Sequence, residues 1–496
     1  MKAFVLAIDQ GTTSSRAILY DQNYRVKASA QEELNQHFPQ PGWVEHNPEE
    51  IWRTVLSVCR TVFLAAKIDA SDIVSIGIAN QRETSIIWDR ETGVPIYNAI
   101  VWQDRRTAEI CERYKKSGEE PEVREKTGLL LDSYFSATKI TWILDNVNGA
   151  RKRAERGELV FGTVDTFLLW RFTGGKVHAT DATNASRTML CNIETGNWDY
   201  QLLDLFRIPR SILPQIMNSA DDFGLVDDVF FGHEIPIRSI AGDQQAATIG
   251  QACFSPGMIK STFGTGSFVL LNTGEEKVLS NNRMLTTIAY QLEGKKTYAL
   301  EGSVFVAGAA IHWLRDQLKI IESADQSSQM AEASDSAQNI IMIPAFTGLG
   351  APYWDPNARG SIFGLTRSTG PNEIVRAALE AVCFQTRDLL EAMYSDWSPQ
   401  SQSWAALRAD GGMAANGWCM QFLSNILGVP VDCPLITEST ALGVAYLAGM
   451  KVGFFPEPSV FAEAWKCDRY FKPKMKRDIS EKRYSDWKDA VKRTLT

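Results

Sequence analysis

Apolar runs separated by polar turns divide the chain into predicted strands and helices. Near the start, apolar runs at 4–8 and 16–20 enclose a turn rich in glycine and hydroxyl residues, which predicts a hairpin of two strands. Residues 73–80 and 84–89 also predict strands. Residues 158–174 predict a strand that runs into a helix. Strands that alternate with helices in this way are typical of an α/β fold.

The hairpin pattern then occurs a second time. Residues 259–275 again show a strand, a turn of Gly, Thr and Ser, and a strand. A third glycine-rich turn, within 406–431, ends a strand and opens a helix. Residues 239–254 predict a strand that turns into a helix after Asp243. The repetition predicts two α/β halves, each of which opens with one hairpin.

The last part of the chain predicts further helices. Residues 439–449 form a run of small residues, which favours a helix that packs closely against a neighbour. The tail from Lys474 is charged and amphipathic, which predicts a solvated terminal helix. A chain of 496 residues is too long for one core. We therefore expect domains at 1–250 and 251–496, packed with a cleft between them.

Composition and charge exclude several classes of function. The net charge of −8 argues against a nucleic-acid partner bound through a broad basic surface. No apolar run is long enough to span a membrane, and the N-terminus meets a carboxylate too early for a signal peptide. The eight cysteines show no CxxC pair and no metal-binding spacing with histidine. We expect reduced thiols in a cytoplasmic protein.

The first hairpin has the chemistry of an anion-binding turn. Backbone N–H groups converge in a tight turn that contains glycine, and Thr12, Thr13 and Ser14 add hydroxyl donors. Arg16 adds a positive charge. Asp9 would repel a phosphate directly, so its natural partner is Mg²⁺ held between this carboxylate and the phosphates. The sequence therefore predicts one side of a nucleotide site.

A single hairpin of this kind is also compatible with an ordinary β-turn. Two copies and a third glycine turn favour the gripping of a polyphosphate. The chain has neither the GxxxxGK[ST] loop nor a GxGxxG sequence after a strand. Paired phosphate hairpins without those loops resemble the actin, hexokinase and Hsp70 superfamily. That resemblance implies two ribonuclease-H-like, actin-like ATPase domains that flank a central cleft.

Longer motifs narrow the resemblance to one family. Residues 134–146 and 360–380 resemble the two signatures of the FGGY carbohydrate kinases. Residues 80–89, 99–107 and 344–360 resemble the members of that family that phosphorylate glycerol. The resemblance implies ATP-dependent phosphorylation of glycerol to sn-glycerol 3-phosphate, the first step of glycerol catabolism. It also implies ATP and ADP as substrate and product, with Mg²⁺.

The residue types agree with a small triol as phosphoryl acceptor. Arg82 and Glu83 can donate to and accept from neighbouring hydroxyls, although this pair alone would be read as a surface ion pair. Asp243 is the expected base, and it could also be a helix N-cap. By resemblance, the acceptor contacts are Arg82, Glu83, Trp102, Tyr134, Asp243, Gln244 and Phe268.

The nucleotide contacts are also assigned by resemblance. They occur in all three glycine turns, with the adenosine site in the C-terminal domain and the glycerol site in the N-terminal domain. The predicted contacts are Thr12, Thr13, Ser14, Arg16, Thr265, Gly308, His312, Gly412 and Asn416, with Asp9 at the metal.

Four positions depart from the family pattern. His312 stands where many relatives have glutamine, and we expect a mild change in nucleotide affinity. Asp104 stands where cysteine is common, and we expect it at the rim of the pocket. Val229 replaces the histidine that many Gram-positive relatives phosphorylate, and His233 is displaced along that loop. The basic loop that serves fructose 1,6-bisphosphate in enterobacterial relatives is also missing, so we expect neither form of control.

Two alternatives stay open beside a kinase for glycerol. One is an FGGY kinase for another small polyol or a sugar. The other is an ATP-driven assembly or chaperone protein, which shares the hairpins but does not need Arg82, Glu83 and Trp102. Relatives form dimers and tetramers, so we expect a homodimer or homotetramer.

Overall fold

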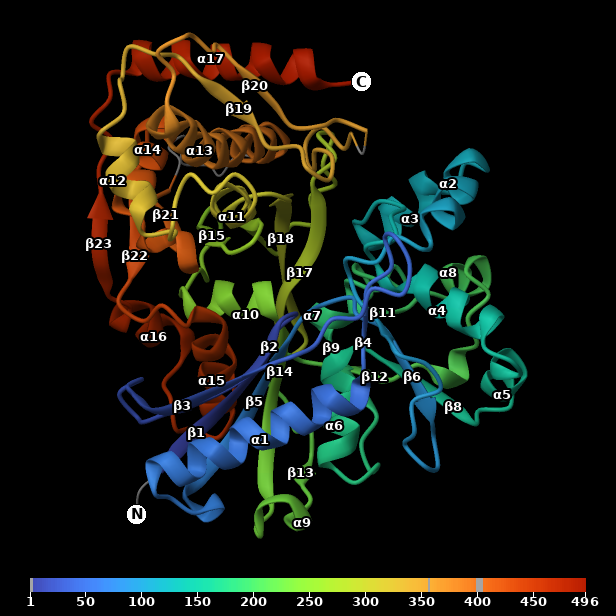
Figure 1. Cartoon of the computed structure of the whole chain (residues 1–496). Coiled ribbons are helices and arrows are strands. Elements are labelled where there is room, and N and C mark those ends of the chain that lie inside the picture. The colour runs from blue at the N-terminus through green and yellow to red at the C-terminus, as the bar shows by residue number, and fades with distance from the viewer. Residues whose placement is uncertain (1–2, 356, 398–404) are drawn as a thin grey trace.

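The computed structural model describes residues 3–355, 357–397 and 405–496. Its described part contains two large mixed sheets, of six and seven strands. In Figure 1 one sheet lies in the lower part of the molecule and the other in the upper part, with α10 (Asp243–Gly250) between them.

The first sheet has the order β13-β14-β5-β1-β2-β3. β2 lies antiparallel to both β1 and β3, whereas β5 and β14 continue the sheet parallel to β1. The central strands β1, β5 and β14 are mostly buried, whereas the edge strand β3 is polar and largely exposed. The bounds are β1 Phe4–Gln10, β2 Ser14–Tyr20, β3 Val26–Glu33, β5 Ile73–Asn80, β13 Leu225–Val226 and β14 Ile235–Gly242.

The second sheet has the order β17-β18-β16-β15-β21-β22-β23. β16 lies antiparallel to β15 and β18, and β21 and β22 follow parallel to β15. The bounds are β15 Ile259–Phe263, β16 Ser267–Gly274, β17 Leu285–Leu292, β18 Lys295–Val304, β21 Leu407–Asp410, β22 Val431–Pro434 and β23 Cys467–Phe471.

The two sheets therefore repeat one topology. In each, a hairpin and a third antiparallel strand beside it, β3 or β18, are extended by two parallel strands on the side of the first strand, and in the second sheet β17 adds a further antiparallel strand beyond β18. This arrangement agrees with the predicted pair of ribonuclease-H-like α/β domains. Each sheet opens with one of the two predicted hairpins, β1–β2 and β15–β16.

Helix α1 (Pro48–Ala66) and α6 (Val164–Phe172) pack on the first sheet. The start of α1 is well specified, because the Asn47 side chain accepts from the N–H of Glu49 and Pro48 occupies the first turn. Trp52 from α1 packs edge-on against Phe172 from α6. These contacts fix the outer wall of the first domain.

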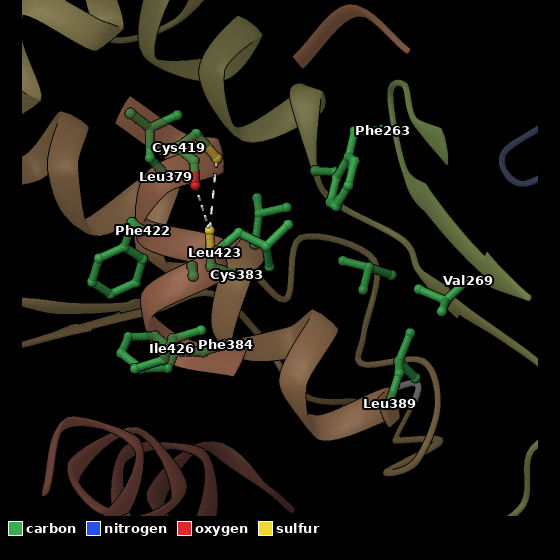
Figure 2. Packing of buried hydrophobic residues seen from close by; sticks show 14 of the residues in the cluster. Phe263, Val269, Leu379, Cys383, Phe384, Leu389, Cys419, Phe422, Leu423 and Ile426 are labelled. Carbon is green, nitrogen blue, oxygen red and sulfur yellow. Dashed lines mark hydrogen bonds between the residues drawn. The ribbon is translucent and has the colours of Figure 1, made fainter. Parts of the chain in front are cut away.

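Three long helices form the wall of the second sheet: α13 (Pro371–Asp396), α14 (Gly417–Leu427) and α17 (Arg477–Thr494). The terminal helix α17 forms as predicted, but one of its faces is buried. Tyr484 and Trp487 both donate hydrogen bonds to the carboxylate of Asp388 on α13. Figure 2 shows the apolar packing of α13 against α14, including Phe384 and Phe422.

The small-residue helix α15 (Ser439–Lys451) packs closely, as its sequence predicts. A methyl group at Gly250 or Gly443 would overlap the backbone of the opposite helix, so only glycine allows this approach of α10 and α15. The same helix also lies on the first sheet, where Ser239 Oγ donates to the carbonyl of Val444 at 2.7 Å. A helix late in the chain thus completes the packing of the first sheet.

A separate group of helices forms the right-hand side of the first domain in Figure 1. These helices are α2 Ala108–Lys116, α3 Glu120–Thr127, α4 Ser136–Asn146, α5 Ala150–Glu155 and α8 Tyr200–Leu205. The remaining strands and helices are β4 Glu45–His46, β6 Ile86–Asp89, β7 Ala99–Ile100, β8 Leu159–Gly162, β9 Ala179–Asp181, β10 Cys191–Asn192, β11 Asn197–Trp198, β12 Gln215–Met217, β19 Ile341–Ile343, β20 Ser361–Phe363, α7 Ala182–Ala185, α9 Asp228–Phe231, α11 Gly308–Asp316, α12 Gln326–Glu332 and α16 Pro458–Ala464.

Two general expectations can be compared with the described residues. None of the described helices is both long and apolar enough to cross a lipid bilayer. All eight cysteines are free thiols, of which only Cys467 is exposed.

Candidate active site

The first hairpin is a tight turn held by side chains from behind. The N–H of Gly11 donates to the carbonyl of Ser14 at 2.9 Å. Gln81 Nε2 donates to Gln10 Oε1 at 3.0 Å and to the carbonyl of Gly11 at 3.2 Å. On the other side, Trp102 Nε1 donates to Thr12 Oγ1 at 2.9 Å. Trp102, a predicted glycerol contact, is therefore hydrogen-bonded directly to Thr12, a predicted nucleotide contact.

The charged residues of this hairpin lie beside each other. Asp9 and Arg16 face each other in the register of β1 and β2, and Arg16 forms an ion pair with Glu438. Burial, and after it the nearby carboxylate of Asp243, raise the pKa of Asp9 to about 7, against the opposing effect of Arg16. Two carboxylates that disfavour each other's charge fit a divalent cation. Among the described residues no three His, Cys, Asp or Glu side chains gather into a group that could hold a metal ion.

Arg82 is buried at the centre of the predicted acceptor site. It follows β5, and its Nε lies 3.3 Å from Asp243 Oδ1 at the end of β14. The predicted Arg82–Glu83 pair is not at the surface, since both side chains are at most 2% exposed. Glu83 has a φ of +61°, which is unfavourable for a residue with a side chain. Ser136 Oγ on α4 donates to the Glu83 carbonyl at 2.9 Å and helps to hold this conformation.

Asp243 is the first residue of α10 rather than its N-cap, which is Gly242. Its side chain is 29% exposed. Burial raises the pKa of the Asp243 carboxyl above its ordinary value, while Arg82 and the N–H of Gln244 oppose the shift. A carboxylate that is raised in pKa and open to the solvent on one side can accept a proton from a hydroxyl.

Three aromatic rings lie at the predicted glycerol site beside Arg82. The Trp102 ring lies 5.5 Å from that of Tyr134 and 6.2 Å from that of Phe268, measured between centroids. Phe268 belongs to β16 in the second half of the chain, so the rings come from both halves. The loop of Tyr134 is fixed by the buried Lys139, whose Nζ donates to the carbonyls of Ser133 and Tyr134 at 2.5 and 2.6 Å.

The second hairpin forms one wall of a pocket of about 550 Å³. Thr265, Gly308, His312, Gly412 and Asn416, the five predicted nucleotide contacts in this half, all line it. Asn416 also caps α14, because its side chain accepts from the N–H of Cys419 at 2.9 Å. Nearby in the sequence of α14, Cys419 meets Cys383 of α13, and their sulfur atoms are 3.7 Å apart (Figure 2).

Gln244 lies at the junction of the two halves. Its Oε1 accepts from Lys260 Nζ at 2.7 Å, and Lys260 also donates to Thr262 Oγ1 at 2.8 Å. Lys260 is completely buried and is the second residue of β15. The structure thus places an ammonium group between the second hairpin and the helix that begins with Asp243.

The expectation that Asp104 lies at the pocket rim is wrong. Asp104 is buried, and its Oδ2 accepts from the N–H of Val44 at 2.6 Å and from Arg106 at 2.8 Å. Arg106 also pairs with Glu45 and stacks on Trp43, with its Cζ 3.8 Å from the ring centroid. A carboxylate fits here because it satisfies a buried arginine.

The segment that contains Val229 and His233 is a short helix, α9, followed by an exposed stretch. Val229 is 73% exposed within α9, and His233 follows the helix on an exposed stretch. The expected absence of both forms of control stays a prediction.

Sequence reasoning missed Glu301, Arg187 and Lys260. Glu301 and Lys260 are charged residues at interior positions of strands, and a charge at such a position was the available signal. Arg187 lies in a stretch that resembles the family, but nothing in its local pattern shows its partners.

The chain is similar over its whole length to known carbohydrate kinases. The model for the N-terminal domain of the FGGY family of carbohydrate kinases matches residues 4–250, and the model for its C-terminal domain matches residues 259–452. A glycerol kinase of Rhizobium meliloti (strain 1021) is 58% identical over 495 residues, which cover 100% of this chain and 99% of the relative. A glycerol kinase of Rhodopseudomonas palustris (strain BisA53) is 59% identical over 493 residues, 99% of each chain.

Solved structures give the same result. The crystal structure of Plasmodium falciparum glycerol kinase with ADP matches with a TM-score of 0.93 at 38% identity, covering 100% of this chain and 99% of that one. Gluconate kinase from Lactobacillus acidophilus matches with a TM-score of 0.88 at 23% identity, over 99% of this chain and 98% of that one, which shows a shared fold.

Proposed function

Because the chain belongs to the FGGY family of carbohydrate kinases, we propose that it transfers the γ-phosphoryl group of ATP to a terminal hydroxyl of glycerol, the first step of glycerol catabolism. The product is sn-glycerol 3-phosphate. The observation that carries the proposal is the grouping of Arg82, Asp243 and three aromatic rings in one site. Full-length relatives at 58–59% identity that are named glycerol kinase support it.

The acceptor residues divide the work of binding. Trp102, Tyr134 and Phe268 would cover the carbon backbone of glycerol, while Arg82, Glu83 and Gln244 would bond its hydroxyls. Asp243 would hold the attacking hydroxyl and accept its proton. Phosphoryl transfer depends mainly on positioning and on neutralising charge, so the role of Asp243 is first to orient the hydroxyl.

The nucleotide would lie between the two hairpins. Thr12, Thr13, Ser14 and Arg16 would contact the phosphates from the first domain, and Thr265 from the second. Gly308, His312, Gly412 and Asn416 would contact the adenosine in the 550 Å³ pocket. Asp9 would hold Mg²⁺ directly or through water, and the ion would neutralise charge on the transferred phosphoryl group.

Several broader features belong to the same proposal. We place the domain boundary at 250–251, with the glycerol site mainly in 1–250 and the adenosine site in 251–496. We also propose a cytoplasmic enzyme that assembles as a homodimer or homotetramer. Family membership leaves no need for the assembly or chaperone alternative, whereas a kinase for another small polyol or sugar keeps the same fold.

The first test is the acceptor specificity of the purified protein. ADP release with Mg-ATP is measured with glycerol, dihydroxyacetone, xylulose, ribulose, erythritol and no acceptor. Strong turnover that requires glycerol, with little ATP hydrolysis alone, is the expected result. Turnover only with a larger acceptor would contradict the assignment of glycerol and retain the kinase.

A further inference from the structure

The hydrogen bonds of Arg82 divide its guanidinium into a fixed edge and an open edge. Glu301 accepts from Nη1 at 2.6 Å and from Nη2 at 3.0 Å, in a bidentate pair. Gln245 Oε1 accepts from Nη1 at 3.2 Å. The remaining contacts are longer, with Asp243 3.3 Å from Nε and Tyr134 Oη 3.4 Å from Nη2. These two long contacts are made by Asp243 and Tyr134, which we assign to the binding of glycerol.

Glu301 is shared with a second arginine. Arg187 Nη2 donates to Glu301 Oε1 at 3.0 Å, and Arg187 Nε donates to Glu83 Oε1 at 2.7 Å. The four side chains Arg82, Glu83, Arg187 and Glu301 thus form a chain of alternating charge. Each of them is at most 2% exposed. Water therefore does not compete for these bonds, and each charge depends on its protein partners.

The charge state of Glu301 is set by the two arginines. Burial by itself would raise the pKa of Glu301, but Arg187 and Arg82 outweigh burial and hold this pKa below its ordinary value. Lys260 acts in the same direction. A carboxylate that stays ionised can accept from both guanidinium groups at once, which neither an amide nor a carboxylic acid can do equally well.

We propose that Glu301 and Arg187 are positioning residues for the acceptor, an inference that rests on the proposed function. Glu301 fixes one edge of Arg82 so that Nε and Nη2 face Asp243 and Tyr134, where hydroxyls of the substrate take the place of the long contacts. Arg187 fixes the Glu83 carboxylate, whose backbone has the unfavourable φ of +61°. Because Glu301 lies on β18, the second half of the chain completes the acceptor site.

The main test is Glu301→Gln in the full-length protein. Glutamine keeps the volume but turns one acceptor oxygen into a donor that faces an arginine. We expect the KM for glycerol to rise at least tenfold, with a lower kcat, while the KM for ATP stays within twofold. Isothermal titration with glycerol in the absence of nucleotide should show the same loss of affinity. Glycerol parameters within twofold of the wild type would overturn the proposal.

Two further variants separate positioning from stability. Glu301→Gln combined with Arg187→Met removes one charge of each sign and restores the balance of the buried cluster. We expect this double variant to recover thermal stability but not glycerol affinity, whereas recovery of both would show a merely structural role. If Glu301→Gln does not fold, Glu301→Asp keeps the charge but is too short to span both arginines, and glycerol KM should still rise. An unchanged KM in that variant would overturn the proposal.

Glu380→Gln is the matched control. Glu380 is also a buried carboxylate of the second half, 2% exposed, with its Oε2 2.6 Å from Arg483 Nη2. It should lose stability without a change in glycerol KM. If the wild type turns over another acceptor and not glycerol, the proposed function fails. The variants are then measured with that acceptor, and the same rise in KM would support the positioning role.

Discussion

The two phosphate-type hairpins occupy the same place in the two sheets but differ in their support. The first one receives backbone hydrogen bonds, such as that from the N–H of Gln81 to the carbonyl of Gln10 at 2.7 Å, and its turn is also held by the side chains of Gln81 and Trp102. The turn of the second one is held by backbone groups. The carbonyl of Thr265 accepts from the N–H groups of Ala307 and Ala309 at 2.9 and 3.0 Å, and that of Gly264 accepts from Gly308 at 3.0 Å.

The two hairpins also differ in the charged residues that they carry. Asp9 and Arg16 lie at the first hairpin, and Asp243 is close enough to raise the pKa of Asp9. The turn of the second hairpin, from Phe263 to Ser267, contains no charged residue. We infer that changes of functional group should damage the first hairpin and its surroundings, whereas added volume should damage the second.

The largest effect is expected from Asp243→Asn, which removes the proposed base beside the first hairpin. The amide keeps the volume but cannot accept the proton, so kcat should fall by about 10²–10⁴. Nucleotide binding should persist, as measured by titration with ADP. Unchanged turnover would show that neither proton acceptance nor charge at this position contributes.

Asp9→Asn should have the next largest effect. Loss of a ligand to Mg²⁺ removes a few kcal/mol of charge stabilisation, which corresponds to about a hundredfold in kcat/KM for Mg-ATP. The variant should also need more Mg²⁺ for half-maximal activity at fixed ATP. Because asparagine relieves a buried charge, the ligand-free protein should unfold at the same temperature or higher. An unchanged Mg²⁺ requirement would argue that Asp9 does not hold the ion.

Gly308→Ala tests the second hairpin through volume alone. A methyl group at Gly308 would lie 2.7 Å from the carbonyl oxygen of Gly264, so the hairpin must shift. We expect the KM for ATP to rise about tenfold, the order of one misplaced contact. Gly417→Ala is the matched control, since it lines the same pocket and nothing lies within 4 Å of its added methyl group. Equal effects of the two variants would contradict the comparison.

Elements of the fold that depend on local pattern could be predicted from the sequence. Apolar runs around glycine and hydroxyl residues gave both hairpins, because turn residues and strand residues have distinct backbone preferences. The third turn was also predicted, and Gly412 and Asn416 line the pocket with the second hairpin. The resemblance, rather than the pattern, brought Arg82 and Asp243 into one site.

Features that depend on distant packing could not be predicted. Arg82 and Glu301 are 219 positions apart, and no local rule pairs them. Asp104 was misplaced because its surroundings, Val44 and Arg106, become visible only when the loops are folded. Burial of a charge is decided by which partners the whole fold brings to it, so the sequence shows the charged residue but not its neighbour.

His46→Gln should have the smallest effect, and it examines the side-chain support of the first hairpin. His46 is completely buried, and its Nδ1 lies 3.3 Å from Gln81 Nε2. Burial, and after it nearby His37, lower the pKa of His46 to about 4. Since the unfolded chain binds this proton near pH 6.5, the folded state loses stability as the pH falls from about 6.5 to 4.

Glutamine cannot take up that proton, so the wild type should lose thermal stability relative to His46→Gln on acidification. The expected difference is about 1 °C in the unfolding midpoint per pH unit, since one proton is worth ~1.4 kcal/mol per unit and the chain is long.

His178→Gln is the control, because burial also lowers the pKa of His178 to about 4 while its Nε2 contacts the carbonyl of Phe161 at 2.8 Å, in another part of the fold. Both variants should flatten the pH profile of stability, but only His46→Gln, which changes the contact with Gln81, should also change ADP affinity, and it should do so at neutral pH, where His46 is uncharged. If neither variant, or both, changes that affinity, the network of His46 and Gln81 is not what supports the first hairpin.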